Sequence, residues 1–315
     1  MKKILITGVS SCSGIHAVRH LANRSDTHVF GTARRSFTLS GLQECIECDF
    51  SQGSEIERAI RHVVPDEVLH LAGSSDASRP TEMLQTNVLG TLRLIGACER
   101  LDKQVKLLLV GSAACFGEMR NDESGLGELR DCRPDSVYGI SRFAQGELGR
   151  LADGQNQLKI YLCRTFNLIG RGLSDRYVPR ALAIRIATAA TEGAERLVLR
   201  NMSAVRDFVD VRDTVAAYFS ILDLGRTAIP YSIGRGEGVT IKQLARLIAA
   251  EKGVAMAFID DTASSSSSRS GITRSIADPT ALISDTGWAP MISLKESIRD
   301  MLAAREPDQR RDRAT

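Results

Sequence analysis

The chain has 315 residues, with 41 Lys and Arg against 38 Asp and Glu, and a formal net charge of +3. This length suits one large α/β domain, or a large domain that carries a smaller one, and excludes a single small module. A charge so close to zero gives no electrostatic case for nucleic acid or a membrane surface as a partner, so local groups would have to hold any anionic ligand.

No signal peptide or membrane span is expected. The opening residues, MKKILITG, contain no apolar stretch of signal-peptide length, and no run of about 18 uncharged apolar residues occurs in the chain. We therefore expect a cytoplasmic protein. The seven cysteines are scattered through periodic segments and are expected to be reduced core thiols. Cys45 and Cys48 have C-x-x-C spacing, but no second pair follows, so no metal site is expected.

Short apolar runs alternate with helix-length segments through the first half of the chain. This alternation predicts parallel strands joined by crossover helices. The expected fold is α/β, a Rossmann-type doubly wound parallel sheet with a smaller C-terminal substrate-binding region, and ligands should bind at the carboxyl ends of the strands. The expected strands are KILIT, HVFGT, CIECDF, EVLHLAG, VKLLLVGS and LKIYLCR.

The connecting segments carry helical periodicity. In residues 87–101, Val88, Leu92, Ile95 and Cys98 recur at three- and four-residue spacings. This spacing predicts one apolar stripe that packs on the sheet.

The regular alternation weakens after Arg164. We expect residues 1–164 to form a dinucleotide-binding domain, 165–305 to be mainly a substrate-binding region, and 306–315 to be a disordered tail. The serine run at 264–268 predicts a flexible surface loop, and a helix near residues 293–304 should close the fold.

The first expected strand runs directly into a glycine-containing turn and a helix, which is the context that a dinucleotide fingerprint requires. Gly8 permits the tight turn and Gly14 allows close packing of the helix on the strand. Ser11 replaces the middle glycine, but its N–H and hydroxyl can still bind an anion at the helix N-terminus. The candidate phosphate-binding residues are Gly8, Ser10, Ser11, Cys12, Ser13 and Gly14.

The second expected strand ends without the acidic residue that would bind the ribose diol of NAD. Arg34 and Arg35 stand there instead and favour the 2′-phosphate of NADP(H), although an ordinary solvated basic turn is the alternative. Asp49, after the third strand, is positioned to accept from the adenine amino group.

Ser112 follows the fifth expected strand, so its hydroxyl should lie at the carboxyl end of the sheet, where the substrate is expected to bind. Tyr138 and Arg142 are four residues apart on one face of a predicted helix. A phenol ordinarily keeps its proton up to about pH 10, so proton exchange at neutral pH requires a nearby positive charge. Arg142 supplies that charge.

In combination, these stretches resemble the extended short-chain dehydrogenase/reductases that act on nucleotide sugars, the NAD-dependent epimerase/dehydratase family. The resemblance rests on TGVSSCSG, CDF, HLAG, NVLGT, GSAACFG, YGISR, RTFNLIGRG and VRDFVDVRD. Within the family, the sequence is most similar to reductases of GDP-4-keto-6-deoxy-D-mannose, through YLCRTFNLIGRG, AVRDFVDVRDTVAAY and DTGWAP. The resemblance implies an NADP(H) cofactor, a nucleotide-diphosphate sugar that is expected to be GDP-linked, and a homodimer formed through two helices of each subunit.

The resemblance also implies further site residues. Asn167 would contact the sugar diphosphate and Arg206 would grip it, although a salt bridge within residues 206–213 is the alternative for Arg206. Arg180 is a further candidate substrate contact. The remaining candidate cofactor contacts are Phe50, Leu71, Ala72, Gly73 and Asn87, together with Tyr138 and Arg142.

Three departures from the family pattern bear on function. Lysine is usual where Arg142 stands, and the exchange leaves three readings open: reduction with slower chemistry, an epimerase or ring mutase that retains its cofactor, or a non-catalytic NADP(H)-binding protein. Ala114 replaces the acidic residue that a dehydratase needs, which disfavours dehydration. Ser268 and Gly271 replace nucleotide-contacting residues, and Arg269 could substitute after a slip of one residue, so this segment weakens the guanosine assignment.

Overall fold

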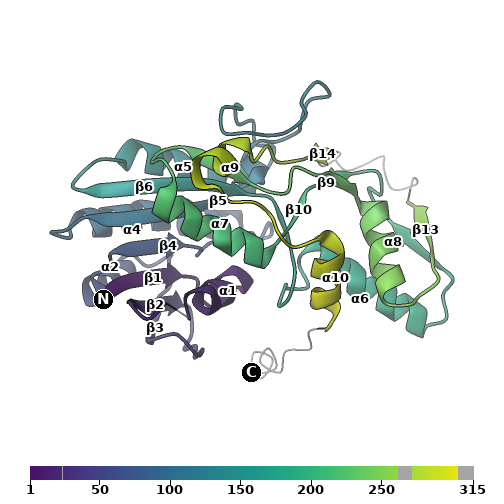
Figure 1. Cartoon of the computed structure of the whole chain (residues 1–315), viewed down its shortest axis with the longest axis horizontal. Coiled ribbons are helices and arrows are strands. Elements are labelled where there is room, and N and C mark those ends of the chain that lie inside the picture. The colour runs from purple at the N-terminus through teal and green to yellow at the C-terminus, as the bar shows by residue number, and fades with distance from the viewer. Residues whose placement is uncertain (23, 262–271, 304–315) are drawn as a thin grey trace.

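The computed structural model describes residues 1–22, 24–261 and 272–303 and is built around a seven-stranded parallel sheet (Figure 1). The strands follow the order β11-β6-β5-β4-β1-β2-β3, and every neighbouring pair is parallel. This architecture confirms the predicted Rossmann-type sheet. The strands are β1 (Lys2–Thr7), β2 (Thr27–Ala33), β3 (Glu44–Glu47), β4 (Glu67–His70), β5 (Val105–Ser112), β6 (Leu158–Thr165) and β11 (Pro230–Ile233).

Helices cover both faces of this sheet. On one face, α1 (Cys12–Leu21) packs against α7 (Val211–Leu224), with α9 (Thr280–Thr286) beside them; Figure 1 shows α7 in front of the strands. The other face carries α2 (Gly53–Val63), α4 (Gly90–Glu99) and α5 (Val137–Ala152).

The central strands are buried on both faces of the sheet because helices cover each face. In β1, Ile4 and Ile6 belong to the core beneath α1 and α7, while Leu5 lies in the core beneath α2 and α4. A strand buried on both faces has a continuous run of apolar residues, and this run is why β1 can be predicted from the sequence.

The predicted stripe on residues 87–101 is correct in its second half and wrong in its first half. Ile95 and Cys98 are buried as expected, but Leu92 is 49% exposed. The inward positions one residue earlier are polar: Asn87 and Thr91 are fully buried. Both make buried hydrogen bonds, so the apolar pattern alone could not identify the face that packs inward.

A second, smaller part lies to the right in Figure 1 and has its own core. Its helices are α6 (Val178–Thr191), α8 (Ile241–Glu251) and α10 (Leu294–Ala303). Three small sheets accompany them: β7 (Asn167–Ile169) with β10 (Phe208–Asp210), β8 (Arg196–Leu199) with β13 (Ala257–Asp260), and β9 (Val205–Arg206) between β12 (Val239–Thr240) and β14 (Arg274–Ser275).

The chain crosses between the two parts more than once. It enters the second part after β6, returns to the main sheet with α7 and β11, and then builds α8. Residues after 164 therefore contribute to both parts. The helix expected near 293–304 is α10. The serine run at 264–268 and the tail at 306–315 lie outside the described residues.

Three short elements complete the chain: α3 (Pro80–Leu84), a π-helical turn (Gln85–Leu89) and a 3-10 turn (Ala113–Cys115). All seven cysteines are free thiols. Within the described ranges, no helix combines the length and apolar character needed to cross a membrane.

Candidate active site

The glycine turn after β1 is held tightly at both ends. Gly8 has φ of +65°, and a Cβ there would lie 2.9 Å from the amide nitrogen of Ala72. A Cβ at Gly14 would overlap the carbonyl of Val9. Both glycines are therefore required for the turn to close, as the fingerprint predicts.

The start of α1 is capped by the serine that replaces the middle glycine. The Ser11 hydroxyl accepts a hydrogen bond from the Gly14 N–H at 3.1 Å, and its own O–H proton stays available as a donor. Ser10 and Ser11 are exposed and Ser13 is buried. Cys12 lies 3.4 Å from the carbonyl oxygen of Arg171, so this turn also touches the second part.

The expected adenosine end lies at the next two strands. Arg34 and Arg35 directly follow β2 and are exposed. Asp49 follows β3, and one of its carboxylate oxygens accepts from the Ser51 N–H at 2.9 Å. The Phe50 ring is buried, 5.1 Å from the ring of His70.

A hydrogen-bonded chain runs beneath the loop that follows β4. The Thr7 hydroxyl accepts from the N–H groups of Leu71 and Ala72, both at 3.1 Å, so its one proton is directed to His70 Nδ1, 2.8 Å away. His70 Nε2 then donates to the Thr91 hydroxyl at 3.1 Å. Burial, assisted by Arg142, lowers the pKa of His70 to about 3. This histidine is therefore a neutral support for the loop at Leu71–Gly73.

Asn87 joins the same loop to α5. Its side-chain oxygen accepts from the Ser74 N–H at 2.7 Å, and its side-chain nitrogen donates to the Ser74 carbonyl at 2.8 Å and the Ser141 hydroxyl at 2.9 Å. Because the amide is fully buried and both of its N–H donors are used, Asn87 positions the loop and the helix relative to each other.

Ser112 and Tyr138 stand on two elements that touch. Ser112 ends β5 and caps the 3-10 turn by accepting from the Ala114 N–H at 3.2 Å. Tyr138 lies in the first turn of α5, which Ser136 caps through the Gly139 N–H at 3.1 Å. A Cβ at Gly139 would overlap the Ala114 carbonyl oxygen, so the turn and the helix meet at this glycine.

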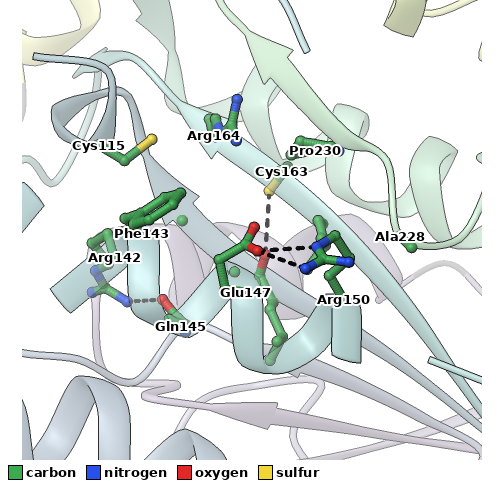
Figure 2. Close-up of a pocket in the computed structure, with 14 residues that line it drawn as sticks. Cys115, Arg142, Phe143, Gln145, Glu147, Arg150, Cys163, Arg164, Ala228 and Pro230 are labelled. Atoms are coloured by element: carbon green, nitrogen blue, oxygen red, sulfur yellow. Dashed lines mark hydrogen bonds and ion pairs between the residues drawn. The ribbon is translucent and has the colours of Figure 1, made fainter. Parts of the chain in front are cut away.

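Arg142 lies between Tyr138 and the loop after β4. Its Cζ is 5.5 Å from the centroid of the Tyr138 ring, and a Cβ at Gly73 would stand 2.9 Å from this Cζ and overlap Nη2. Nη1 donates to Gln145 Oε1 at 2.8 Å, as Figure 2 shows. Sequence reasoning missed Gln145, although its position three residues after Arg142 on one helix was a usable signal.

A cavity of about 40 Å³ lies behind Arg142, between α5 and the β5, β6 and β11 strands (Figure 2). Three residues that line it each have a buried side-chain nitrogen without a hydrogen-bond partner among the described residues: Arg142 Nε, Gln145 Nε2 and Arg164 Nη1. A cavity of this size can hold ordered water, for which these three nitrogens are available as hydrogen-bond donors.

Three of the four candidate substrate residues lie in the second part, and the fourth, Ser112, ends β5. Asn167 donates to the Asp207 carbonyl at 3.0 Å. Arg180 is paired with Asp175 at 3.3 Å.

Arg206 donates to the Val205 carbonyl at 2.9 Å and to the Ile272 carbonyl, and burial lowers its pKa. Within residues 206–213, all of which the structure describes, Arg206 does not form the salt bridge that was its alternative role. The salt bridge in this stretch joins Arg212 to Asp210 at 2.9 Å. Ser268, Arg269 and Gly271 lie outside the described residues.

Sequence reasoning also missed Asp207, which binds the backbone of two segments that lie far along the chain. This buried carboxylate accepts from the N–H groups of Arg235 at 2.9 Å, Gly236 at 2.8 Å and Ala277 at 3.1 Å. Burial raises its pKa to about 6. Asp207 follows Arg206 in the stretch VRDF, but the neighbouring sequence does not indicate that the N–H groups that bind its carboxylate lie far along the chain.

Residues 4–234 match the model of the NAD dependent epimerase/dehydratase family. The chain therefore belongs to this family of NAD(P)-dependent nucleotide-sugar dehydratases, epimerases and reductases, the extended short-chain dehydrogenase/reductases, as the sequence predicts.

Its relatives span more than one activity. The chain is 30% identical to GDP-6-deoxy-D-mannose reductase of Pseudomonas aeruginosa over 247 residues, which cover 76% of this chain and 80% of the relative. The structure of RMD from Pseudomonas aeruginosa complexed with NADPH superposes with a TM-score of 0.83 at 26% identity, over 96% of this chain and 98% of that one. UDP-glucose 4-epimerase of Thermus thermophilus, complexed with NAD, gives a TM-score of 0.82 at 25% identity, over 95% and 97% of the two chains.

Proposed function

We propose that the protein uses NADPH to reduce the C4 ketone of a 4-keto-6-deoxy nucleotide sugar, and that the sugar is GDP-linked. The observation that carries this proposal is the arrangement of Tyr138 and Arg142 on α5, next to the turn that Ser112 caps. The 30% identity to a GDP-6-deoxy-D-mannose reductase supports the sugar class.

The residues at the carboxyl ends of β1, β2, β3 and β4 fit NADP(H). The turn at Gly8–Gly14 has no room for side chains at its two glycines and presents the N-terminus of α1, which suits a pyrophosphate. Arg34 and Arg35 would hold the 2′-phosphate, Asp49 and Phe50 the adenine, and Leu71–Gly73 the nicotinamide half. When bound, the cofactor supplies the hydride for reduction.

Tyr138 and Ser112 would handle the substrate oxygen. We assign Tyr138 as the group that gives its proton to the C4 oxygen and Ser112 as a hydrogen-bond donor to the same oxygen. Arg142 would stabilise the phenolate that remains, because its guanidinium lies 5.5 Å from the Tyr138 ring. The same guanidinium lies against Gly73, where it can also contact the nicotinamide ribose.

In this proposal, the second part of residues 165–305 holds the nucleotide sugar. Arg206, Arg180 and Asn167 would bind its diphosphate, with Arg206 offering the guanidinium donors that Val205 and Ile272 leave free. Residues 1–164, with the returning α7 and β11, would hold the cofactor.

An isomerase is the second candidate function. An epimerase or ring mutase that keeps its cofactor bound is favoured by one observation: Gln145 and Gly73 confine the Arg142 guanidinium, where the family usually has lysine. A non-catalytic NADP(H)-binding protein is the third possibility. It predicts that removing the Tyr138 hydroxyl changes nothing.

A homodimer formed through α4 and α5 completes the proposal. Five apolar residues on α5 and around α4 are exposed: Leu89 at 45%, Leu92 at 49%, Val137 at 41%, Ile140 at 49% and Leu151 at 63%. Adjacent exposed apolar side chains mark interaction surfaces. Light scattering should give the mass of a dimer, and the double variant Ile140→Lys, Leu151→Lys should give a monomer. A wild-type monomer would contradict this assembly.

The first experiment mixes purified protein with NADPH and freshly made GDP-4-keto-6-deoxy-D-mannose while nicotinamide absorbance and sugar product are followed together. Product formed in proportion to NADPH consumed supports the reductase. Product without NADPH consumption identifies an isomerase, and absence of both rejects this substrate. Tyr138→Phe should lower kcat at least about 100-fold, whereas Tyr161→Phe, which removes a phenol hydroxyl from β6, should not.

A further inference from the structure

Two cysteines that are 17 residues apart in the sequence are in contact beside the candidate active site. The sulfur atoms of Cys132 and Cys115 lie 3.5 Å apart. The segments that carry them are also joined by their backbones, since the Arg133 N–H donates to the Phe116 carbonyl at 3.3 Å. A Cβ at Gly117 would overlap the Arg133 carbonyl, so the two segments pack closely. The packing of the chain itself therefore brings the two thiols together.

Two guanidinium groups flank this pair. Arg130 donates to the carbonyl of Phe116, which directly follows Cys115, and its Cζ lies 6.0 Å from the Phe116 ring centroid. Arg164 lies over the same ring at 4.6 Å. Figure 2 shows the Cys115 sulfur directed to the side of the cavity where Arg164 lies. Positive charge close to a thiol favours the reactive thiolate.

The two thiols differ in access and in acidity. Cys132 is partly exposed, whereas Cys115 is only 2% exposed. The contact between the two thiols lowers the pKa of Cys132, with help from Arg164 and Arg130, and raises the pKa of Cys115. In contrast, burial raises the pKa of Cys98 and Cys163 to about 12. Cys132 is thus suited to react with a solvent-borne oxidant and Cys115 to react with Cys132 afterwards.

We propose that Cys132 and Cys115 form a peroxide-reactive dithiol, a site of reversible disulfide formation between the segment that follows Ser112 and the segment that leads to Tyr138. The oxidant is a hydroperoxide such as hydrogen peroxide. The Cys132 thiolate attacks one peroxide oxygen, the O–O bond breaks, and a sulfenic acid forms with loss of hydroxide. The Cys115 thiol then displaces the sulfenic oxygen as water, which forms the S–S bond and completes a two-electron oxidation.

The disulfide would reach the candidate active site through the 3-10 turn. A disulfide bond is about 2.05 Å long, so the two sulfurs must approach each other by roughly 1.5 Å. Cys115 ends the turn that Ser112 caps, and Ala114 of that turn is packed against Gly139 of α5. The turn has little room to move without shifting Ser112 relative to Tyr138. Oxidation therefore lowers catalytic turnover, and reduction restores it.

The test treats the NADPH-loaded protein with hydrogen peroxide, blocks free thiols and analyses tryptic peptides by mass spectrometry. The expected product is peptide 107–120 joined to peptide 131–142 with the loss of two hydrogen atoms, and dithiothreitol should reverse it. Cys132→Ser should abolish the product and leave Cys115 unoxidised. Cys115→Ser should leave a sulfenic acid on Cys132 that dimedone traps. Cys45→Ser, at a partly buried thiol in β3, is the matched control and should form the disulfide as the wild type does.

Rates provide a second test that is independent of the reaction that the protein catalyses. At neutral pH, iodoacetamide should alkylate Cys132 at least about tenfold faster than Cys45, whose pKa burial raises. Equal rates at the two thiols, or peroxide treatment that oxidises other cysteines without joining 115 to 132, would overturn the proposal. An assay for turnover, once a substrate is known, should show a loss that dithiothreitol reverses in the wild type and that is absent in Cys132→Ser.

Discussion

Arg142 lies directly against the backbone of Gly73, and a Cβ on residue 73 would stand 2.9 Å from its Cζ and overlap Nη2. Gly73 follows β4, and Arg142 lies on α5, so this contact joins the loop expected to hold nicotinamide to the helix that carries Tyr138. A third element supports the same junction, because Asn87 bonds both Ser74 and Ser141. The position of the guanidinium relative to Tyr138 thus depends on a glycine 69 residues earlier in the chain.

Gly73→Ala should impair catalysis more than folding. The added methyl group overlaps the end of a flexible side chain, so Arg142 can move away from Tyr138 while the backbone stays in place. We expect a kcat about tenfold lower and a nearly unchanged Tm. Gly96→Ala is the matched control, since its Cβ would also meet the end of an arginine, Arg100, but away from the site. A fully active Gly73→Ala enzyme would show that the contact between Arg142 and Gly73 is not needed for catalysis.

The charge of Arg142 should matter more than its shape. Arg142→Lys keeps the positive charge but loses the bond to Gln145, so we expect kcat to stay within about tenfold of the wild type. Arg142→Met should lower kcat at least about 100-fold, because nothing then stabilises the phenolate. Arg150→Met, on the same helix, removes only a surface pair with Glu147 and should be silent. Steady-state kinetics of the three variants measure these changes in kcat. A fully active Arg142→Met enzyme would show that the charge at residue 142 is not needed for catalysis.

His70 should make the folded state sensitive to acid. Its pKa is lowered to about 3 in the folded protein, whereas an unfolded histidine titrates near pH 6.5. Between these values the unfolded chain binds a proton that the folded chain does not, so the free energy of unfolding falls as the pH falls from about 6.5 toward 3.

His70→Gln, which retains one donor and one acceptor for Thr91 and Thr7, should lose less stability with acid than the wild type does. Urea unfolding of both proteins at about pH 7.5 and about pH 5 measures the difference. Equal losses in the two proteins would show that other groups carry the acid sensitivity.

Two glycines of α5 should respond oppositely to alanine. A Cβ at Gly149 would stand 2.6 Å from Leu109 Cδ1 and 3.0 Å from Leu162 Cδ2, whereas nothing lies within 4 Å of one at Gly146. We expect Gly149→Ala to lower the free energy of unfolding by about 1–3 kcal/mol through overpacking. Gly146→Ala should raise it by up to about 1 kcal/mol, because alanine favours helix. Denaturant unfolding of both variants measures these changes. Equal changes in the free energy of unfolding would mean that α5 can move away from the sheet to make room for a methyl group at residue 149.

Arg34 and Arg35 should determine the choice between the two nicotinamide cofactors. Replacing both with alanine should raise KM for NADPH at least about tenfold and leave KM for NADH unchanged, because only NADPH carries the 2′-phosphate. Arg61→Ala, an exposed arginine on α2 that pairs with Glu57, is the control for a general loss of positive charge. Parallel rises in both KM values would contradict the assignment.

The sequence predicts the sheet and its ligand-binding edge well, because these depend on local patterns. The central strands, such as β1 and β4, are buried on both faces and read as apolar runs, and the glycine turn lies directly after β1. The four-residue spacing of Tyr138 and Arg142 likewise places them on one face of a helix wherever that helix lies. The same patterns carry the family resemblance that residues 4–234 confirm.

The buried face of α4 could not be predicted in this way. The apolar residues favour a stripe through Leu92, but the structure buries Asn87 and Thr91, since Ser141 and His70 provide hydrogen-bond partners for them. Whether a polar side chain can be buried depends on groups that other elements bring to it. Periodicity within a single segment contains no information about those groups.

From local apolar periodicity and short spacings, the sequence by itself determined the class of fold, the positions of the first six strands along the chain and the edge of the sheet where ligands are expected to bind. Only the tertiary structure decided that Arg142 rests on Gly73, that Asp207 collects N–H groups from two distant segments, and that Cys115 meets Cys132. Each of these contacts joins segments that are far apart along the chain. Their meeting depends on how the helices and loops pack, and no repeat of two or 3.6 residues encodes it.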